Sequence, residues 1–463
     1  MENIILISCP QHLTRDRLPF GYSQEPLHLL YLGKVIKDIA NPVILDYNVE
    51  RYDPGELIDH LNNYKPKIIG FTFTAASYLT FQQILSDISS VKKKNGFITV
   101  AGGIQASSMP DYTFRNNPDL DFIIIGEGEI PFRDFVNSKS SQYEKVKNLF
   151  SRNNDTAYKG DEYNVIDVEE LGWPDRTMIS QNKYRDYKTL RSIGSIFSSR
   201  GCPYACSFCY NSLSENRSLR YRSAESLIEE VIEARDKFGI HCFFIMDDFF
   251  TFNIDRVKSF CNGILSKKIK IRWYCQGRAD QGDYEMFKLM RDSGCRSIAM
   301  GIESGSEKNL KYIGKKTNKE KMLKTIGLAQ KAGIKLRGNF IIGFPGENHE
   351  EIMSNIAFAK SLKLSRTAFF ILTPFPHSLI WNEAVERKLI DVDTIDWNRF
   401  NQQSPFFVDK VGPRELIRYL NWGNQHTTNN ILQKIYNYIV SADKREFIID
   451  YFSYYLRRFH NQR

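Results

Sequence analysis

The sequence predicts an α/β protein in which two parallel-sheet units follow one another and a helical region closes the chain. Short apolar runs alternate with segments of helical apolar spacing over residues 1–137, and again over residues 191–376. This alternation is typical of parallel sheets whose faces are covered by helices. Residues 138–190 between the two units are polar and rich in Lys, Ser and Asn, so they predict a linker.

The first unit is expected to be a doubly wound parallel sheet. Five short apolar runs predict its strands, at residues 3–8, 43–46, 67–73, 97–101 and 121–125. Helical spacing predicts helices at residues 26–38, 54–62 and 81–91. Sheets of this kind bind ligands at the carboxyl ends of their strands, and Gly-containing turns follow the fourth and fifth runs there.

The second unit repeats the strand–helix alternation six times. Its predicted strands are residues 195–199, 242–246, 271–275, 297–302, 339–343 and 367–371. A helix is expected over residues 224–238, with Ser223 as its N-cap and Gly239 as its stop signal. Six repeats are too few for a closed eight-fold barrel, so the sequence predicts a partial, open barrel with its site at the carboxyl ends of the strands.

Composition narrows the class of protein. With 42% hydrophobic and 25% charged residues, the chain is expected to be globular, and residues 377–463 are expected to form a helical, aromatic-rich cap. The formal charge of +9 is spread along the chain, which fits an anionic ligand or a peripheral surface and does not by itself indicate nucleic-acid binding. No apolar run approaches the ~20 residues that cross a bilayer. Scattered thiols without a leader segment indicate a cytoplasmic protein.

Three closely spaced cysteines are the most specific motif in the chain. Cys202, Cys206 and Cys209 follow the first strand of the second unit with the spacing C-x3-C-x2-C. Three thiolates can hold three irons of a 4Fe–4S cluster and leave the fourth iron open to a substrate, whereas a cluster with four Cys ligands mainly carries electrons. The motif therefore predicts both a metal cluster and a reaction.

Two other roles for these cysteines fit the sequence less well. Structural zinc needs a fourth ligand, and no C-x2-C or H-x3-H partner follows at usable spacing. A disulfide framework does not fit a chain whose other five cysteines, at positions 9, 242, 261, 275 and 295, are scattered over apolar segments.

In this setting the cysteine loop resembles that of the radical S-adenosylmethionine superfamily, and Phe208 just before the last Cys fits the same pattern. The resemblance implies further contacts to S-adenosylmethionine at successive strand ends. Its ammonium would be met by Asp247 and Asp248, its carboxylate by Arg278, its ribose by Glu303, and its adenine by Ile342 and Gly343. These residue types also suit the ligand on physical grounds, because each one complements the group that it would meet.

The first unit resembles the cobalamin-binding domain that precedes the barrel in one subfamily of these enzymes. The resemblance rests on residues 24–32, on Ala101-Gly102-Gly103 and on Gly126-Glu127-Gly128-Glu129. It implies a cobalamin site made by Thr72, Thr74, Gly102, Gly103, Gln105, Gly126, Glu127, Gly128 and Glu129.

One departure concerns the cobalt ligand. Many cobalamin domains supply an imidazole from Asp-x-His-x-x-Gly, whereas the corresponding place here, residues 46–51, contains no His. His12 and His28 are interpreted as surface or packing residues. A degenerate domain that no longer binds cobalamin is the alternative.

The resemblance implies an enzyme that cleaves S-adenosylmethionine reductively, makes a 5′-deoxyadenosyl radical and methylates an unactivated carbon with the help of cobalamin. The alternatives are a cobalamin-assisted cyclase or oxidoreductase, a radical enzyme without cobalamin, and, more remotely, an Fe–S electron carrier. An external reductant such as flavodoxin or ferredoxin is expected. The substrate is expected to be a small molecule, lipid or peptide.

Overall fold

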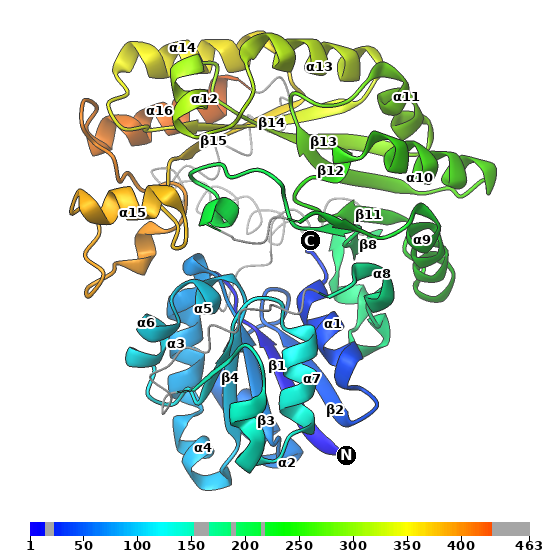
Figure 1. Cartoon of the computed structure of the whole chain (residues 1–463), viewed down its shortest axis with the longest axis vertical. Helices are drawn as coiled ribbons and strands as arrows, with labels where there is room; N and C mark the ends of the chain where they lie inside the picture. The colour runs from blue at the N-terminus through cyan, green and yellow to red at the C-terminus, as the bar shows by residue number, and fades with distance from the viewer. Residues whose placement is uncertain (14–22, 152–165, 187–190, 214–217, 428–463) are drawn as a thin grey trace, which may run out of the picture.

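Two α/β units are stacked on one another in the computed structural model, which describes residues 1–13, 23–151, 166–186, 191–213 and 218–427 (Figure 1). The strands of the N-terminal sheet run upward from the N-terminus in Figure 1, so their carboxyl ends face the second unit. This arrangement confirms the predicted fold class of a doubly wound sheet followed by a partial barrel.

The N-terminal sheet has the strand order β2-β1-β3-β4-β5-β6. Its strands are β1 (Glu2–Ser8), β2 (Ala40–Asp46), β3 (Ile68–Thr72), β4 (Ile98–Gly102), β5 (Phe122–Ile124) and β6 (Leu149–Ser151). The first five strands are parallel, and β6 is antiparallel to β5. The order reverses between β1 and β3, and ligands bind outside the strand ends at such a switch point.

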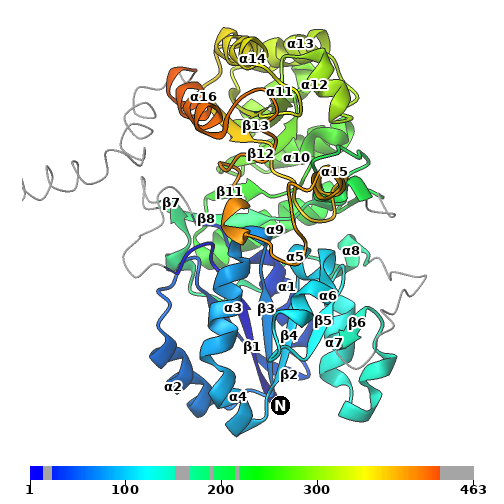
Figure 2. The same ribbon diagram turned by 90° about the vertical axis from the view of Figure 1, so that its left-hand side faces the viewer.

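Helices cover both faces of this sheet (Figure 2). The helices are α1 (Leu27–Ile36), α2 (Pro54–Tyr64), α3 (Tyr78–Asp87), α4 (Ser89–Asn95), α5 (Ile104–Ser108), α6 (Pro110–Arg115) and α7 (Glu129–Asn137). Buried side chains of α1 and α7 form one apolar core with the sheet, and those of α2, α3 and α4 contribute to another.

Two elements of this unit differ from the sequence expectation. The single helix expected over residues 81–91 is divided, because Ile88, at φ −92° and ψ −2°, ends α3 and remains buried before α4 begins. Strand β6 lies in the expected linker, since a three-residue strand is too short to show a period in the sequence.

The second unit is a curved sheet of six parallel strands in chain order, with a short antiparallel strand, β7 (Arg185–Asp186), at one edge. The parallel strands are β8 (Arg191–Ile196), β11 (Cys242–Ile245), β12 (Arg272–Arg278), β13 (Cys295–Glu303), β14 (Lys335–Ile342) and β15 (Arg366–Ile371). The sheet does not close, as expected for a six-fold repeat.

The outer face of this sheet packs against helices, and one large apolar core lies between them. The helices of this unit are α9 (Ala224–Phe238), α10 (Ile254–Ser266), α11 (Tyr284–Asp292), α12 (Glu307–Tyr312), α13 (Lys319–Lys331) and α14 (His349–Ser361). Helix α9 begins and ends as expected, with Ser223 accepting a hydrogen bond from Ser226 N and Gly239 in the left-handed region at φ 65°.

A narrow two-stranded stem carries the cysteine loop. Strands β9 (Ser199–Arg200) and β10 (Arg220–Tyr221) pair antiparallel and enclose the loop between them. Gly201 follows β9 with φ +92°, and a Cβ there would lie 2.2 Å from the Ser218 carbonyl oxygen. Only glycine allows the stem to close so tightly.

The linker joins the two units through buried charges. It contains a short helix, α8 (Val168–Leu171), and the Trp173 ring, whose centroid lies 5.9 Å from the Arg222 guanidinium. Farther on, Arg176 forms ion pairs with Glu25 of the first unit at 3.1 Å and with Glu230 of helix α9 at 2.8 Å. Glu230 also pairs with Arg222. These side chains are at most 2% exposed.

The described part of the C-terminal region contacts both units. Helix α15 (Leu379–Glu386) and the Trp397 side chain pack into the core of the first unit, where Trp397 Nε1 donates to the Tyr112 hydroxyl at 3.1 Å. Helix α16 (Pro413–His426) packs on β15 through Leu416 and Leu420. The rest of the expected helical cap, residues 428–463, lies outside the described residues.

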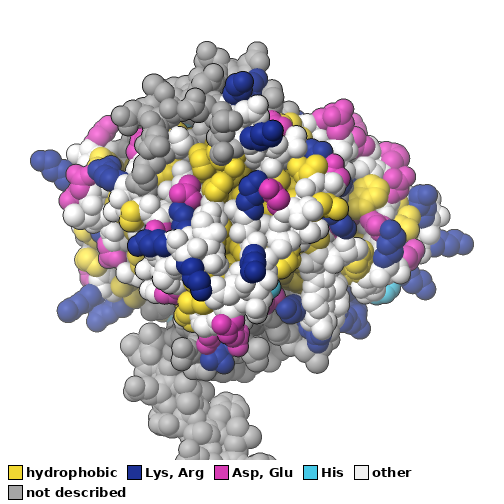
Figure 3. Space-filling model, turned by 90° about the horizontal axis from the view of Figure 1, so that it is seen from below, with side chains coloured by type: hydrophobic (Ala, Val, Ile, Leu, Met, Phe, Trp, Pro, Cys, Tyr) yellow, Lys and Arg dark blue, Asp and Glu magenta, His cyan; other side chains and the backbone are white. Residues whose placement is uncertain are grey.

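The distribution of surface charge and the lengths of the helices agree with what the composition predicts. On the face of the N-terminal unit that lies away from the barrel, Lys and Arg are interspersed with Asp and Glu (Figure 3). Among the described residues, no helix is both long enough and apolar enough to span a bilayer.

Candidate functional site

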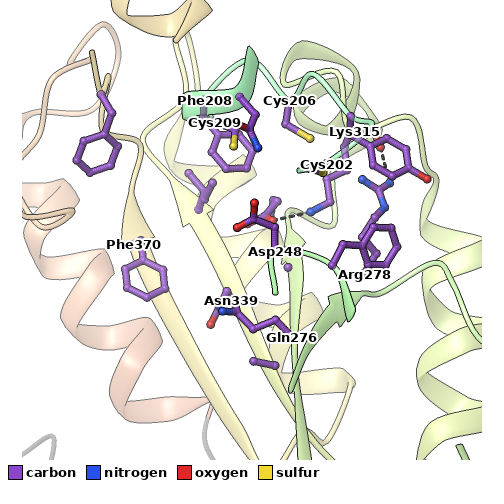
Figure 4. A pocket seen from close by; sticks show the side chains of 18 of the residues that line it. Cys202, Cys206, Phe208, Cys209, Asp248, Gln276, Arg278, Lys315, Asn339 and Phe370 are labelled. Atoms are coloured by element: carbon purple, nitrogen blue, oxygen red, sulfur yellow. Dashed lines mark hydrogen bonds and ion pairs between the residues drawn. The ribbon is translucent and has the colours of Figure 1, made fainter. Parts of the chain in front are cut away.

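The three motif cysteines share one cavity of about 390 Å³ at the carboxyl ends of the barrel strands (Figure 4). The loop is fixed by hydrogen bonds from Cys209 N to the Cys206 carbonyl, at 2.9 Å, and from Ser207 N to the Ile313 carbonyl, at 2.9 Å. All three cysteines are free thiols. Phe208 also lines the cavity and packs against the core of the N-terminal unit.

The donor set fits a cluster better than a single ion. In the described part of the chain, no group of three or more His, Cys, Asp or Glu side chains is placed to hold one metal ion. The cavity lining contains three thiols and neither a fourth Cys nor a His. Thiolates of a 4Fe–4S cluster bind different irons, so they need not converge on one point. The residues present therefore fit a cluster with one open iron.

Burial raises the pKa of all three thiols, that of Cys209 to about 12. The charges of Lys315 and Arg278 act in the opposite direction on the pKa of Cys206. These two cations thus lie close enough to the loop to favour negative charge on it.

The two adjacent acids after β11 have different surroundings. Asp248 lines the cavity, where burial and the neighbouring Asp247 raise its pKa. Asp247 is 1% exposed and lies outside the cavity. Its carboxylate accepts hydrogen bonds from Ser198 N at 2.7 Å and from Ser199 N at 3.1 Å, and it contacts both hydroxyls. The structure therefore leaves only Asp248 available to a ligand.

Arg278 is the last residue of β12 and is held from three sides. Its guanidinium makes two hydrogen bonds of 2.9 Å to Asp280 and donates to the Lys315 carbonyl at 2.6 Å. The guanidinium carbon lies 4.0 Å from the centroid of the Tyr204 ring, which belongs to the cysteine loop. Arg278 is thus oriented in advance beside the thiols, and it lines the cavity as predicted.

Glu303 ends β13 with φ +63° and lines the same cavity. Its Oε1 accepts a hydrogen bond of 2.6 Å from Lys315 Nζ, and both side chains are at most 10% exposed. Gly301 makes room for this pair, because a Cβ there would lie 2.3 Å from Glu303 Oε1 and 2.9 Å from Lys315 Nζ. Lys315 was not predicted as a site residue, because in the sequence it is one of several lysines in a polar segment.

The segment expected beside adenine is only partly at the cavity. Ile342 is fully buried in the core between sheet and helices, whereas Asn339 and Ile341 line the cavity. Alternate side chains of a strand point to opposite faces, which explains why the neighbour of the predicted residue is the one that faces the cavity. Gly343 turns the chain at φ +80°, and its N–H donates to Glu347 at 2.7 Å.

Glu347 gives a testable pH dependence. Burial raises its pKa to about 7, although hydrogen bonds from Gly343, Phe344 and Asn309 oppose this shift. Below the unfolded-state pKa of 4.5 its contribution to stability is fully present, and the contribution is lost as pH rises through the folded-state pKa of about 7. From pH 5 to pH 8, Glu347→Gln should therefore gain roughly 2–3 kcal/mol relative to wild type in urea unfolding.

The control for this titration is Glu350→Gln, which changes an exposed carboxylate three residues along, in the first turn of α14. It should keep a constant difference from wild type between pH 5 and pH 8. A constant difference for Glu347→Gln as well would contradict the expected role of its carboxyl group.

The predicted cobalamin residues gather at the edge of the first sheet that faces the barrel. Thr72 ends β3, Gly102 ends β4, and Gly103 follows at φ +92°, where a Cβ would lie 2.8 Å from Thr72 Oγ1. Thr74 and Gly126 are exposed, and Gly128 is half-buried. Gln105 is 1% exposed, and its Nε2 has no hydrogen-bond partner. Small residues and an unpaired buried amide at the carboxyl ends of β3, β4 and β5 fit a large flat ligand approaching this edge.

Glu127 and Glu129 have another role in the structure. Glu129 pairs with Arg200 at 2.5 Å, and Glu127 pairs with Arg220. Both arginines belong to the stem of the cysteine loop. The structure thus uses these two carboxylates to join the first unit to the stem.

Asn48 stands where a conventional cobalt-ligating His would be, and its side chain takes part in a structural hydrogen bond. Asp46 is buried and accepts hydrogen bonds from Asn48 Nδ2 at 2.9 Å and from the Tyr184 hydroxyl at 3.1 Å. His12 and His28 are both exposed, which agrees with their interpretation as surface residues.

Comparison with known proteins agrees with this arrangement. The Radical SAM superfamily model matches residues 196–359, and the B12 binding domain model matches residues 17–136. An uncharacterised methyltransferase of Pyrococcus horikoshii is 28% identical over 87% of both chains. The cytidylyl-2-hydroxyethylphosphonate methyltransferase of Streptomyces wedmorensis is 24% identical over 84% of this chain and 83% of its own.

Solved structures share the fold. The radical S-adenosylmethionine methyltransferase TsrM of Kitasatospora setae has a TM-score of 0.66 at 18% identity, covering 84% of this chain and 76% of that chain. The cobalamin-dependent S-adenosylmethionine radical enzyme OxsB has a TM-score of 0.70 at 20% identity, covering 96% and 71%.

Fold, cavity and family models agree on an enzyme that contains a radical SAM domain. The chain joins a B12 binding domain to a radical SAM domain, and it is homologous to cobalamin-dependent radical SAM methyltransferases and to magnesium-protoporphyrin cyclase-like proteins.

Proposed function

We propose that this protein is a cobalamin-dependent methyltransferase that cleaves S-adenosylmethionine reductively and methylates an unactivated carbon of a biosynthetic intermediate. One observation carries the proposal: three thiols, Asp248, Arg278 and Glu303 line a single cavity. The cluster and its bound S-adenosylmethionine would supply radical chemistry, and cobalamin would supply the methyl carrier. An external one-electron reductant of the flavodoxin or ferredoxin type completes the proposal.

In this proposal the chain's own residues bind the cluster and orient S-adenosylmethionine. Cys202, Cys206 and Cys209 hold three irons, and Arg278 and Asp248 receive the carboxylate and the ammonium of S-adenosylmethionine. Glu303, fixed by Lys315, accepts hydrogen bonds from the ribose hydroxyls. The aromatic rings at the cavity exclude water from the reacting atoms. The rings that do so are Phe208, Phe249, Phe370 and Phe375.

We further propose that residues 1–137 bind cobalamin and that residues 191–376 form the catalytic barrel, with residues 138–190 as linker and 377–463 as C-terminal region. The contact between the carboxyl edge of the first sheet and the stem of the cysteine loop supports this division, because it brings both cofactor sites to one interface.

Anaerobic reconstitution tests the function. Protein loaded with iron, sulfide and hydroxocobalamin should hold about one corrin per chain, and it should release 5′-deoxyadenosine when given S-adenosylmethionine and a reductant. Absence of stoichiometric corrin would exclude the methyltransferase proposal. Absence of 5′-deoxyadenosine would exclude radical chemistry of any kind.

A cyclase is the second candidate, because anaerobic magnesium-protoporphyrin IX monomethyl ester cyclases are among the relatives, at 22–24% identity. Product mass separates the two: a methyltransferase adds one methylene unit to its substrate, whereas ring closure by oxidation removes hydrogen.

Asp248→Asn is expected to weaken S-adenosylmethionine binding roughly ten- to a hundredfold, since a hydrogen bond to a charged group contributes about 1.5–3 kcal/mol. Equilibrium dialysis under anaerobic conditions measures this change, with iron content as a check on the cluster. Asp255→Asn, which alters an exposed acid in the first turn of α10, should bind like wild type. Equal affinities for all three proteins would remove Asp248 from the proposed site.

A further inference from the structure

Basic side chains gather on the inner face of the barrel below the cavity. The strand register places Gln276, Ala299, Arg337 and Arg366 side by side in one row across four neighbouring strands. Gln276 and Ala299 line the cavity, so the row begins in its wall and continues to the two arginines. Figure 4 shows Gln276 beside Asn339, on the strand side of the cavity away from the cysteines.

The direction of these side chains follows from strand alternation. On β14, Asn339 and Ile341 line the cavity while Leu336, Phe340 and Ile342 are buried in the core against the helices. Arg337 and Lys335 have the parity of the cavity-lining residues, so they point into the barrel. Likewise, Arg366 has the parity of Phe370, which lines the cavity on β15.

The two rows below Asn339 carry only positive charge. The lower row contains Ser195, Phe244, Tyr274, Ser297 and Lys335, and neither row contains an Asp or a Glu. Within the part of the chain that the structure describes, neither Arg337 nor Lys335 makes an ion pair within 4.0 Å. Arg337 is half-buried, and the strand register places it opposite Arg366 of β15.

The cofactor residues do not account for this charge. Arg278 is paired with Asp280, and Lys315 is paired with Glu303, both in the upper part of the cavity. Each row lies two residues, or about 7 Å, from the next along the strands. Arg337 therefore lies one row deeper than Asn339, and Lys335 lies two rows deeper, on the side away from the cysteine loop.

We infer that the lower barrel binds an oxyanion group of the substrate, of the phosphate, phosphonate or carboxylate type, through Arg337 with the help of Lys335 and Gln276. The guanidinium supplies paired N–H donors that match an oxyanion, and the Gln276 amide supplies another. The inference rests on the proposed function, because it assigns this group to the substrate whose other end reaches the radical site. The substrate is thus an anionic molecule that enters with its charge toward the lower barrel.

Anion titration tests the inference without knowledge of the substrate. Full-length protein with its cluster, saturated with S-adenosylmethionine and kept without reductant, is titrated calorimetrically with inorganic pyrophosphate and separately with succinate at low ionic strength. At least one anion should bind wild type. Arg337→Gln should weaken that binding about tenfold or more, because a charged hydrogen bond is lost. Preference for pyrophosphate or for succinate identifies the class of oxyanion.

Two further variants make the result specific. Lys335→Gln, at the exposed start of β14, should also weaken binding, and it supplies a second reading if Arg337→Gln folds poorly. Arg291→Gln, an exposed change on the outer helix α11, should bind like wild type. The inference is overturned if neither anion binds wild type, or if well-folded Arg337→Gln and Lys335→Gln bind as wild type does. Formation of 5′-deoxyadenosine by wild type is measured separately, so failure of the anion site and failure of the radical chemistry remain distinguishable.

Discussion

Cys206→Ala should abolish both the visible absorbance of the iron–sulfur cluster and the formation of 5′-deoxyadenosine. Cys206 is one of only three thiols in the cavity lining, so its loss leaves two ligands for a cluster that needs three. Anaerobic reconstitution followed by iron analysis, visible spectroscopy and chromatography of the products measures both effects. Product formation at the wild-type level with Cys206→Ala would refute the assignment of the motif.

Cys261→Ala is the matched control for this experiment. Cys261 is also buried, but it lies on α10 in the core between sheet and helices. Its substitution removes a small buried side chain, at a cost of about 1 kcal/mol, and leaves the cavity unchanged. Cluster content and 5′-deoxyadenosine formation should therefore match wild type.

Arg176→Met should lower stability by about 3–5 kcal/mol, because it leaves the buried Glu25 carboxylate without its cation and removes one of the two cations of Glu230. Glu25 and Glu230, which Arg176 bridges, are fully buried and belong to different units. Urea unfolding monitored by tryptophan fluorescence reports on this junction, since Trp173 lies against Arg222 of the same network. A loss below 1 kcal/mol would show that the network does not hold the units together.

An exposed pair from the same linker provides the comparison. Lys37 pairs with Asp175 at 2.5 Å, but the Lys37 side chain is 52% exposed. Lys37→Met should change stability by about 0–1 kcal/mol, as for surface ion pairs in general.

The order of strands and helices could be predicted because apolar periodicity depends on local sequence, and the cysteine motif because its spacing is itself local. The sequence predictions were wrong where two adjacent residues face different surroundings in the structure. Asp247 and Asp248 look equivalent in sequence, yet one fixes the serines after β8 and the other lines the cavity. The predicted Ile342 faces the helices, and Ile341 takes the cavity side, because the strand register decides which neighbour points inward.

Ion pairs between residues that are distant in the sequence could not be predicted either. Lys315 reaches Glu303 across twelve residues, and nothing in its local pattern marks it among the surrounding lysines. Glu127 and Glu129 lie in a Gly-rich turn that suggests a ligand site, but their partners, Arg220 and Arg200, are contributed by the other unit. Only the packing of the two units reveals such contacts.

The division of these ion pairs between the units limits how the protein can be recombined. The acids Glu127 and Glu129 are encoded with the first sheet, and the bases Arg200 and Arg220 are encoded with the cysteine loop. A chimera that exchanged only the N-terminal unit for that of a relative would place foreign side chains against the base of the loop. A graft of either unit therefore has to carry the acids Glu127 and Glu129 together with the bases Arg200 and Arg220.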